Sequence, residues 1–350
     1  MYKLEIFRAD ISFAASFLIS GSTPLSMDYL ALDSFDVDIP HKGIAVQKGD
    51  YCRVSRLPNT VVADFVVSDV GSGKDASTIS LRPLVAVLDR EVFCDGISDC
   101  AAWIAQAVRD NFIDTGDALQ NIPATVTNQA AAASRPIVVD GDICGMVDVL
   151  SGALTTYRIV VNAQLDMAAR MIVFEVRESA VQATIEADLG NVIDKDITLG
   201  DSYGSANKFV ARRVRTVDNV VTVLGQKAFY LHADGSVDDA DRDRITPVFC
   251  AIASIEDAET WEADALAAAT EKLTPAQFDN EIKLDYSRAD KIVQPEALPI
   301  GTEATIYTGG QAYRSLLTGR EWEGGVHRLI FGLVRTDLTK KIILNRRAGK

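Results

Sequence analysis

The segment SFDVDIPHKGIAVQKGDYCRV (residues 34–54) contains two runs of alternating apolar and polar residues, separated by the turn clusters HKG and QKGD. Alternation at period two is typical of strands with one buried face, and glycine beside charged residues marks tight turns. The segment therefore predicts a strand, a turn and a second strand, with Gly49 at the corner. It also contains His41 and Cys52, which raises the alternative of a catalytic loop.

Four pieces of this region recur in the same order near the other end of the chain. The matches are SFDVDI at Ser34 with QFDNEIKL at Gln277, VQKGDYCRV at Val46 with LPIGTEATIY at Leu298, ADFVVSDVGSG at Ala63 with YRSLLTGREWEGG at Tyr313, and STISLRPL at Ser77 with HRLIFGLV at His327. Gly49 and Gly301 stand at equivalent corners, where glycine accepts a positive φ without a steric penalty. This repetition predicts two similar β-barrels. It also makes KGDYCRV a barrel corner rather than a loop around a nucleophilic Cys52.

Length and composition indicate a folded protein with about two to four domains. The chain has 350 residues, of which 48% are apolar, and 49 acids against 35 bases give a net charge of −14. Such a chain is not expected to coat nucleic acid or an anionic membrane, and we expect no sequence-specific nucleic-acid binding. The densest bases are Arg212, Arg213 and Arg215, and the tail residues Lys340, Lys341, Arg346, Arg347 and Lys350.

No apolar run approaches the roughly 20 residues that span a bilayer, so no membrane-spanning segment is expected. The N-terminal stretch MYKLEIFRADISFAASFLIS contains Glu5 and Asp10 and lacks a basic start, so it predicts two short strands rather than a signal peptide. The five cysteines are Cys52, Cys94, Cys100, Cys144 and Cys250. Their odd number and the absence of a C-x-x-C pair favour buried hydrophobic side chains in a reducing cytosol over zinc ligands or disulfides.

The pattern along the chain predicts an α+β fold that is mainly β. Residues 1–90 form the first tube-like barrel, and residues 91–182 a small α+β domain with helices over 98–112 and 142–157, the second capped by Asp142. Residues 183–276 form a β-rich insertion that ends in a helix over 257–274. Residues 277–350 form the second barrel, with strands from 183–225 as candidates to complete it. Residues 127–136 are a linker or an exposed loop.

The residues with chemical potential are dispersed, and we expect no catalytic, cofactor or metal site. His41, His232 and His327 are far apart in sequence. HADGSVDDADRDR (residues 232–244), with Asp234, Asp238, Asp239, Asp241 and Asp243, lacks the order of a calcium loop and predicts a hairpin tip. GSGK (residues 71–74) lacks the full phosphate-loop spacing and predicts a hairpin turn. The clusters at 89–91 and 320–323 leave glycoside cleavage open as an alternative, but solvated or interface charges are favoured.

Several segments resemble the tail hub, or baseplate hub, proteins of tailed bacteriophages. They are the strand pair with Phe35, Ile39, Pro40, Lys48, Gly49 and Asp50, then LRPLVAVLDREV (81–92), NFI…DALQNIP (111–123), LPIGTEATIY (298–307) and IFGLVRTDLTKKI (330–342). Each segment alone is weak, and their common order along nearly the whole chain carries the resemblance.

The resemblance implies two tube-like β-barrels separated by small α/β domains, in a homotrimer that adapts a sixfold tail tube to a threefold central spike or fibre. It implies a non-enzymatic structural protein of the virion tail tip, made in the host cytoplasm, which encloses the DNA exit channel. The implied partners are a distal tail or tail tube ring, the tape measure protein and the central fibre or spike. The chain ends at Lys350 without the C-terminal extension of many hubs, so lytic activity would belong to another protein. The alternatives are a tail-associated peptidoglycan-degrading enzyme and a distal tail ring protein.

Overall fold

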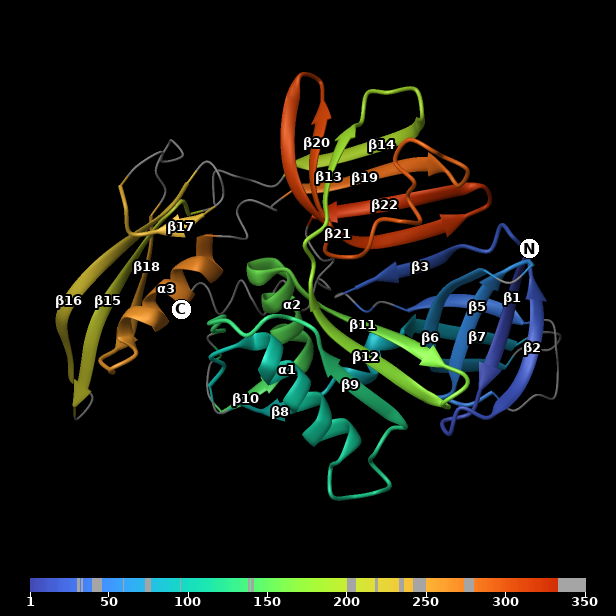
Figure 1. The fold of residues 1–350 in the computed structure, drawn as a ribbon, viewed down its shortest axis with the longest axis horizontal. Coiled ribbons are helices and arrows are strands. Elements are labelled where there is room, and N and C mark those ends of the chain that lie inside the picture. Colours follow the sequence, from blue (N-terminus) through green and yellow to red (C-terminus); the bar gives the residue numbers. More distant parts are fainter. Residues whose placement is uncertain are drawn as a thin grey trace.

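The computed structural model describes residues 1–29, 32, 34–39, 46–58, 60–72, 77–94, 96–137, 139, 142–199, 206–217, 220–232, 236–241, 250–273 and 280–332. Two curved β-sheets and a smaller α+β layer form the body of the molecule, and a third sheet with one helix lies to the side (Figure 1). The expected α+β, mainly β class is confirmed.

The first sheet is antiparallel, with the strand order β2-β1-β5-β6-β7-β4. Its strands are β1 (Tyr2–Phe7), β2 (Phe13–Ile19), β4 (Phe35–Ile39), β5 (Tyr51–Arg56), β6 (Thr60–Ser72) and β7 (Ser77–Pro83). Alternate residues such as Leu4, Val54 and Ile79 are buried on its inner face, as period-two patterning requires. The end strands β2 and β4 contact each other, so this sheet curls almost into a closed barrel.

The second sheet has the order β13-β20-β21-β22-β19-β14, and β3 pairs with β21 in addition. Its strands are β3 (Leu25–Asp28), β13 (Gln182–Glu186), β14 (Val192–Leu199), β19 (Asn280–Ser287), β20 (Glu303–Thr308), β21 (Gln311–Glu323) and β22 (Val326–Gly332). The pair β13–β20 is parallel and the other pairs are antiparallel.

The internal repeat appears as the same strand order in both sheets, with β5-β6-β7-β4 corresponding to β20-β21-β22-β19. Each long middle strand has a bulge at the same place, after Val67 in β6 and after Leu317 in β21. One sequence match is displaced. The sequence match pairs Phe35 with Phe278. In the structure Phe35 faces Leu81, and the residue that faces Phe331, the equivalent of Leu81, is Ile282. The true equivalent of Phe35 is therefore Ile282, four residues later than the sequence match indicates. Phe278 lies outside the described residues.

The α+β layer contains a three-stranded sheet, a two-stranded sheet and two helices. The strands are β8 (Glu91–Phe93), β9 (Ala124–Asn128), β10 (Ile143–Gly145), β11 (Ile159–Asp166) and β12 (Met171–Glu178), with the orders β11-β12-β9 and β10-β8. The helices are α1 (Cys100–Val108), continued by a π-helical turn (Arg109–Ile113), and α2 (Met146–Tyr157), while a 3₁₀ turn (Leu84–Leu88) links β7 to β8.

One expectation for this layer is wrong. The second helix begins at Met146 after Gly145, not at Asp142, because residues 143–145 pair with β8 as a strand. The segment expected as a linker or an exposed loop begins in β9, which pairs in parallel with β12, and residues 129–134 after it form a largely exposed loop.

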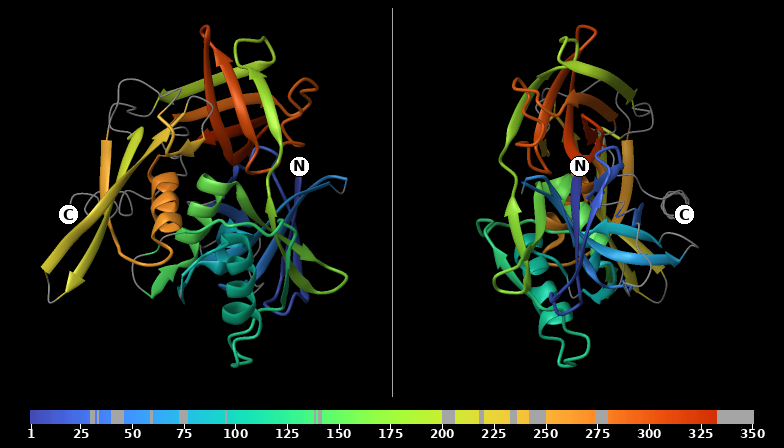
Figure 2. Two further views of the ribbon diagram at one scale, coloured as in Figure 1. Left: turned by 60° about the vertical axis from the view of Figure 1, so that its left-hand side comes forward. Right: turned by 90° about the vertical axis from the view of Figure 1, so that its right-hand side faces the viewer.

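The third sheet has the order β17-β16-β15-β18 and is covered on one face by α3 (Trp261–Leu273), the helix expected over 257–274. Its strands are β15 (Lys208–Val217), β16 (Val220–Leu231), β17 (Val237–Asp238) and β18 (Cys250–Glu256). Phe209 and Phe229 pack against Trp261 and Ala265 of α3. Figures 1 and 2 show the β15–β16 ribbon projecting beyond the helix.

Candidate functional site: the junction of the two sheets

The two corner glycines make the same set of hydrogen bonds. The Gly49 N–H donates to the Val67 carbonyl at 2.9 Å, and the Val67 N–H donates back to the Asp50 carbonyl at 2.8 Å. In the second sheet, the Gly301 N–H donates to Leu317 at 2.8 Å and Leu317 donates to Thr302 at 2.9 Å. Both glycines have positive φ, +90° and +82°. The segment KGDYCRV is therefore a structural corner, as predicted.

The N-terminal part of the chain supplies one strand to the second sheet. After β2 the chain crosses to the second sheet, where β3 pairs with β21 so that Leu25 faces Trp322 and Asp28 faces Gly319. Trp322 is buried in the apolar core of the first sheet, although it belongs to the second. This exchange joins the cores of the two sheets and limits how far one can rotate against the other.

Polar contacts reinforce the same junction. Arg56 of β5 binds Glu296 in a two-pronged geometry, with Nη1–Oε1 and Nη2–Oε2 distances of 2.7 and 3.1 Å. Arg288 donates to the Tyr2 hydroxyl and lies over the Tyr2 ring, 5.4 Å from its centroid. Burial opposes the ionisation of Glu296, but the Arg56 guanidinium outweighs it and lowers the pKa of that carboxyl. Because two parallel hydrogen bonds join the guanidinium to the carboxylate, they fix the relative orientation of the two side chains as well as the distance between them.

His327 lies inside this junction, on β22 opposite Tyr286 and Trp322. Its side chain is fully buried, and its ring centroid is 5.1 Å from that of Trp322. Neither ring nitrogen has a hydrogen-bond partner among the described residues. Burial, together with the nearby Arg320, lowers the pKa of His327 to about 4. The imidazole is thus neutral near pH 7, packed against an indole and unsuited to general-base catalysis at that pH.

The other predicted candidates do not converge. Cys52 is buried in β5, and burial raises the pKa of its thiol well above the ordinary value, which leaves it unreactive. His232 is buried at the end of β16, with Nε2 2.7 Å from an Asp238 carboxylate oxygen. This contact joins the two strands of the β16–β17 hairpin, the hairpin expected at residues 232–244. His41 lies outside the described residues. Four of the cysteines are buried as expected, but Cys250 is exposed.

In each charge cluster one acid forms an ion pair, whereas Nε and Nη2 of Arg320 are buried and have no hydrogen-bond partner among the described residues. Asp89 binds Arg82 at 2.7 Å, and the Arg90 guanidinium lies 4.3 Å from the centroid of the Phe112 ring. Glu321 and Asp285 both bind Arg328, at 3.1 and 2.6 Å. Gly71 and Ser72 end β6, whereas the rest of GSGK, with Asp234, Asp243 and the basic tail from Lys340, lies outside the described residues.

No group of three His, Cys, Asp or Glu side chains within the described ranges is placed to hold a metal ion. In the same ranges, no helix combines the length and apolar character that crossing a membrane requires.

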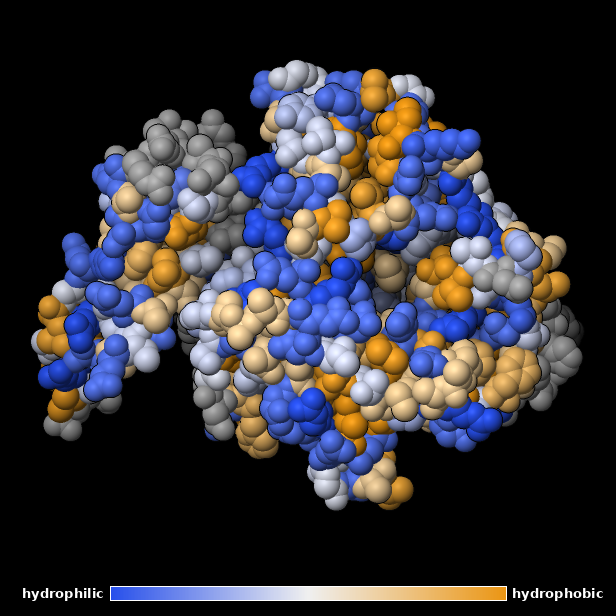
Figure 3. All heavy atoms as spheres, in the orientation of Figure 1, coloured by the Kyte–Doolittle hydropathy of each residue, from blue (hydrophilic) through white to orange (hydrophobic). Residues whose placement is uncertain are grey.

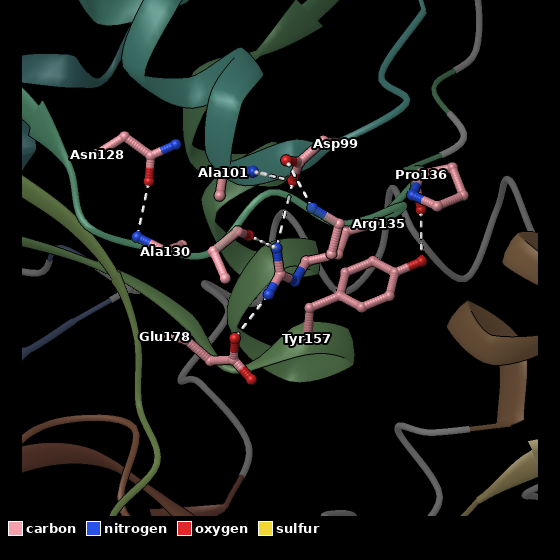
Figure 4. A network of polar contacts seen from close by, with 10 residues as sticks. Asp99, Ala101, Asn128, Ala130, Arg135, Pro136, Tyr157 and Glu178 are labelled. Carbon is pink, nitrogen blue, oxygen red and sulfur yellow. Dashed lines mark hydrogen bonds and ion pairs between the residues drawn. The ribbon is translucent and has the colours of Figure 1, made fainter.

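One buried polar network that no local sequence pattern indicates fixes the segment after β9 (Figure 4). Arg135 is 8% exposed and donates to the Ala131 carbonyl at 2.8 Å and to Glu178 at 2.6 Å. Its guanidinium is 3.6 Å from Asp99, which caps α1 through the Ala101 N–H. The acidic partners are far from Arg135 in sequence, so no local spacing could have revealed them. The segment expected as a linker or an exposed loop is thus a largely exposed loop, which Arg135 holds against the α+β layer.

No protein-family model and no curated protein sequence matches the chain. Its structure is similar to that of the 43 kDa tail protein of prophage MuSo2 from Shewanella oneidensis, with 16% identity, 95% of this chain and 98% of that chain covered, and a TM-score of 0.53. It is also similar to prophage tail protein gp18 from Listeria monocytogenes EGD-e, with 8% identity, 99% and 98% coverage, and a TM-score of 0.55. The chain therefore has the fold of these prophage tail proteins along nearly its whole length.

Proposed function

We propose that the chain is a structural, non-enzymatic hub protein of a phage or phage-like tail tip or baseplate. The duplicated unit, with the same strand order and the same corner hydrogen bonds at Gly49 and Gly301, is the observation that carries the proposal. The shared fold with prophage tail proteins supports the tail as its place.

The duplication has a use in a symmetric assembly. Three copies of a chain with two similar units place six units around one axis, so a threefold object can stack on a sixfold ring. The two units must then keep a fixed relative orientation. The insertion of β3 into the second sheet, the burial of Trp322 in the core of the first sheet and the Arg56–Glu296 pair provide such a joint.

In this assembly the trimer adapts the sixfold tail tube to the threefold central spike or fibre and encloses the DNA exit channel. Its partners are a distal tail or tail tube ring, the tape measure protein and the central fibre or spike. The protein is made in the host cytoplasm and resides at the tip of the tail in the virion. The net charge of −14 supports an acidic channel wall that repels DNA phosphates during passage.

Native mass spectrometry tests the proposal. A mass of three chains is expected for the hub, six chains would favour a distal tail ring protein, and a monomer at all concentrations would refute both. Zymography on bacterial cell walls tests the enzyme alternative, since a cleared band would revive the peptidoglycan-degrading hypothesis. The candidate carboxylates Asp89 and Glu321 are held in ion pairs with Arg82 and Arg328, which supports the expectation of no clearing.

A further inference from the structure

The gap between the two end strands of a curved sheet is here called its seam. In the first sheet the end strands are β2 and β4, and in the second sheet they are β13 and β14, so the two seams lie at different strands of the repeated unit. Strands β1 and β13 hold equivalent positions, next to β5 and β20. In the first sheet the extra strand β2 bonds to β1 and also contacts β4, which closes the curve. In the second sheet the extra strand β14 bonds to β19 instead, and the outer edge of β13 has no strand partner within the described chain.

A groove of about 280 Å³ lies along this open edge. Residues 183–186 of β13 form one side of it, and the apolar side chains of Leu189, Ile292, Val293 and Leu298 contribute most of the rest. Leu189 and Ile292 are 48% and 69% exposed. The volume is close to that of the smallest ligand pockets, about 300 Å³. An open strand edge beside an apolar groove fits an extended segment that adds as a strand and inserts a few apolar side chains.

The strands at the seam are acidic. Glu186 lines the groove, and the exposed acids Asp194 and Asp196 lie on β14, the end strand at the other edge of the sheet. Asp188, between the two strands, pairs with Lys195. An incoming segment should therefore be apolar where it meets the groove and basic on its flanks.

The β15–β16 ribbon of the same chain has both properties. Its tip residues Val217, Val220, Val221, Val223 and Leu224 are each 47–65% exposed. The two strands contain no acid and five bases, Lys208, Arg212, Arg213, Arg215 and Lys227. Arg213 and Arg215 bind Asp257, and Lys227 binds Asp239, so Lys208 and Arg212 are the ribbon bases outside ion pairs within the described chain. Along β16, the edge away from β15 pairs only at Tyr230 and Leu231 within the described chain, which leaves the apolar tip free to add to another strand.

We propose that the β15–β16 ribbon of one copy docks at the β13 seam of a neighbouring copy, with the tip of β16 filling the groove. The ribbon tip points away from β13 of its own chain, so the contact is between copies (Figures 1 and 2). In the space-filling view, apolar and charged residues alternate along the ribbon (Figure 3). Ribbon and groove are different surfaces, so the contact is heterologous, and around the threefold axis of the proposed trimer it closes into a ring. This inference rests on the proposed hub, which supplies the neighbouring copies.

Site-directed cross-linking tests the contact. In a Cys250→Ser background, one chain carries Val221→Cys and a second carries Ile292→Cys, and both positions are exposed. A short bis-maleimide should join the two variants in an equal mixture, and a chain with both changes should give a closed covalent trimer. Val221→Cys mixed with Phe93→Cys, which is 73% exposed, is the matched control and should give no product.

Charge reversal provides an independent measurement of the same contact. Arg212→Glu should raise the dissociation constant of the assembly at least about tenfold, an effect of roughly 1.4 kcal/mol. Combining it with Asp194→Lys and Asp196→Lys should restore assembly. Arg109→Glu makes the same charge change on the exposed end of α1 and should have no effect. Circular dichroism confirms that each variant is folded.

The outcomes separate the two proposals. The docking contact would be overturned, and the hub left intact, if native mass spectrometry showed three chains but no cross-linked product formed. The Arg212→Glu and Arg109→Glu variants would then have the same dissociation constant. A monomer under all conditions would overturn both.

Discussion

Gly49 and Gly301 occupy equivalent corners of the two sheets, yet their surroundings differ. A Cβ added at Gly49 would meet no atom within 4 Å, whereas at Gly301 it would lie 2.6 Å from Val160 Cγ2 and 3.0 Å from Ser179 Cβ. The first corner therefore faces open space, and the second packs against the α+β layer. One backbone motif serves as a free turn in one copy and as a docking point in the other.

Replacing the two glycines by alanine should separate backbone strain from packing. Gly49→Ala should destabilise the protein by about 1–2 kcal/mol, because positive φ is unfavourable for a residue with a Cβ. Gly301→Ala should lose a further 1–3 kcal/mol or so, because the added methyl overpacks the site against Val160. Urea denaturation of both variants measures the difference, and Val160→Ala should recover part of the second loss. Equal losses at the two corners would contradict this account.

The corners were predictable from the sequence because they depend on local properties: glycine at a turn and alternation in the flanking strands. The strand β4 was matched four residues off because its register with β7 is set by long-range pairing. For the same reason Asp142 was mistaken for a helix cap, since β10 takes its strand conformation from pairing with β8. The junction was not predictable at all. Arg56 and Glu296 are 240 residues apart, and long-range contacts such as the pairing of β3 with β21 bring their sheets together.

The Arg56–Glu296 pair should contribute orientation more than stability. A double-mutant cycle with Arg56→Met and Glu296→Gln should give a coupling energy below about 1 kcal/mol, because both side chains are partly exposed. The coupling should fall further in 1 M salt, where the Debye length is about 3 Å. A coupling of several kcal/mol that persists in high salt would show instead that the pair is a main source of stability.

Thiol reactivity should distinguish one cysteine from the other four. Cys250 is exposed and the remaining four are buried, so native protein should react quickly at one thiol per chain and denatured protein at five. Burial raises the pKa of Cys100 and of Cys144 to about 12, and the latter also contacts Cys94, which further lowers their reactivity. Titration with a chromogenic disulfide reports the count. Cys250→Ser should abolish the fast phase, and its survival would place a second thiol at the surface.

His327 should make the protein less stable in acid. Its pKa is about 4 in the folded chain against an ordinary value of 6.5, so the unfolded chain binds the proton more readily between these values. The contribution of neutral His327 to the free energy of unfolding is therefore complete above about pH 6.5 and is lost as the pH falls toward 4. The difference between the two pKa values corresponds to a loss of about 3 kcal/mol in the free energy of unfolding once the pH is below both. Urea denaturation across this pH range measures it.

The control is His327→Phe, which keeps an aromatic ring beside Trp322 and cannot take up a proton. Carboxylates elsewhere also titrate toward pH 4, but they are common to both proteins and cancel in the difference. The difference in unfolding free energy between variant and parent should be constant above pH 6.5 and should shift in favour of the variant as the pH falls below it. Parallel curves down to pH 4 would mean that the buried imidazole accepts a proton as easily as in water, against the burial of its ring in the junction.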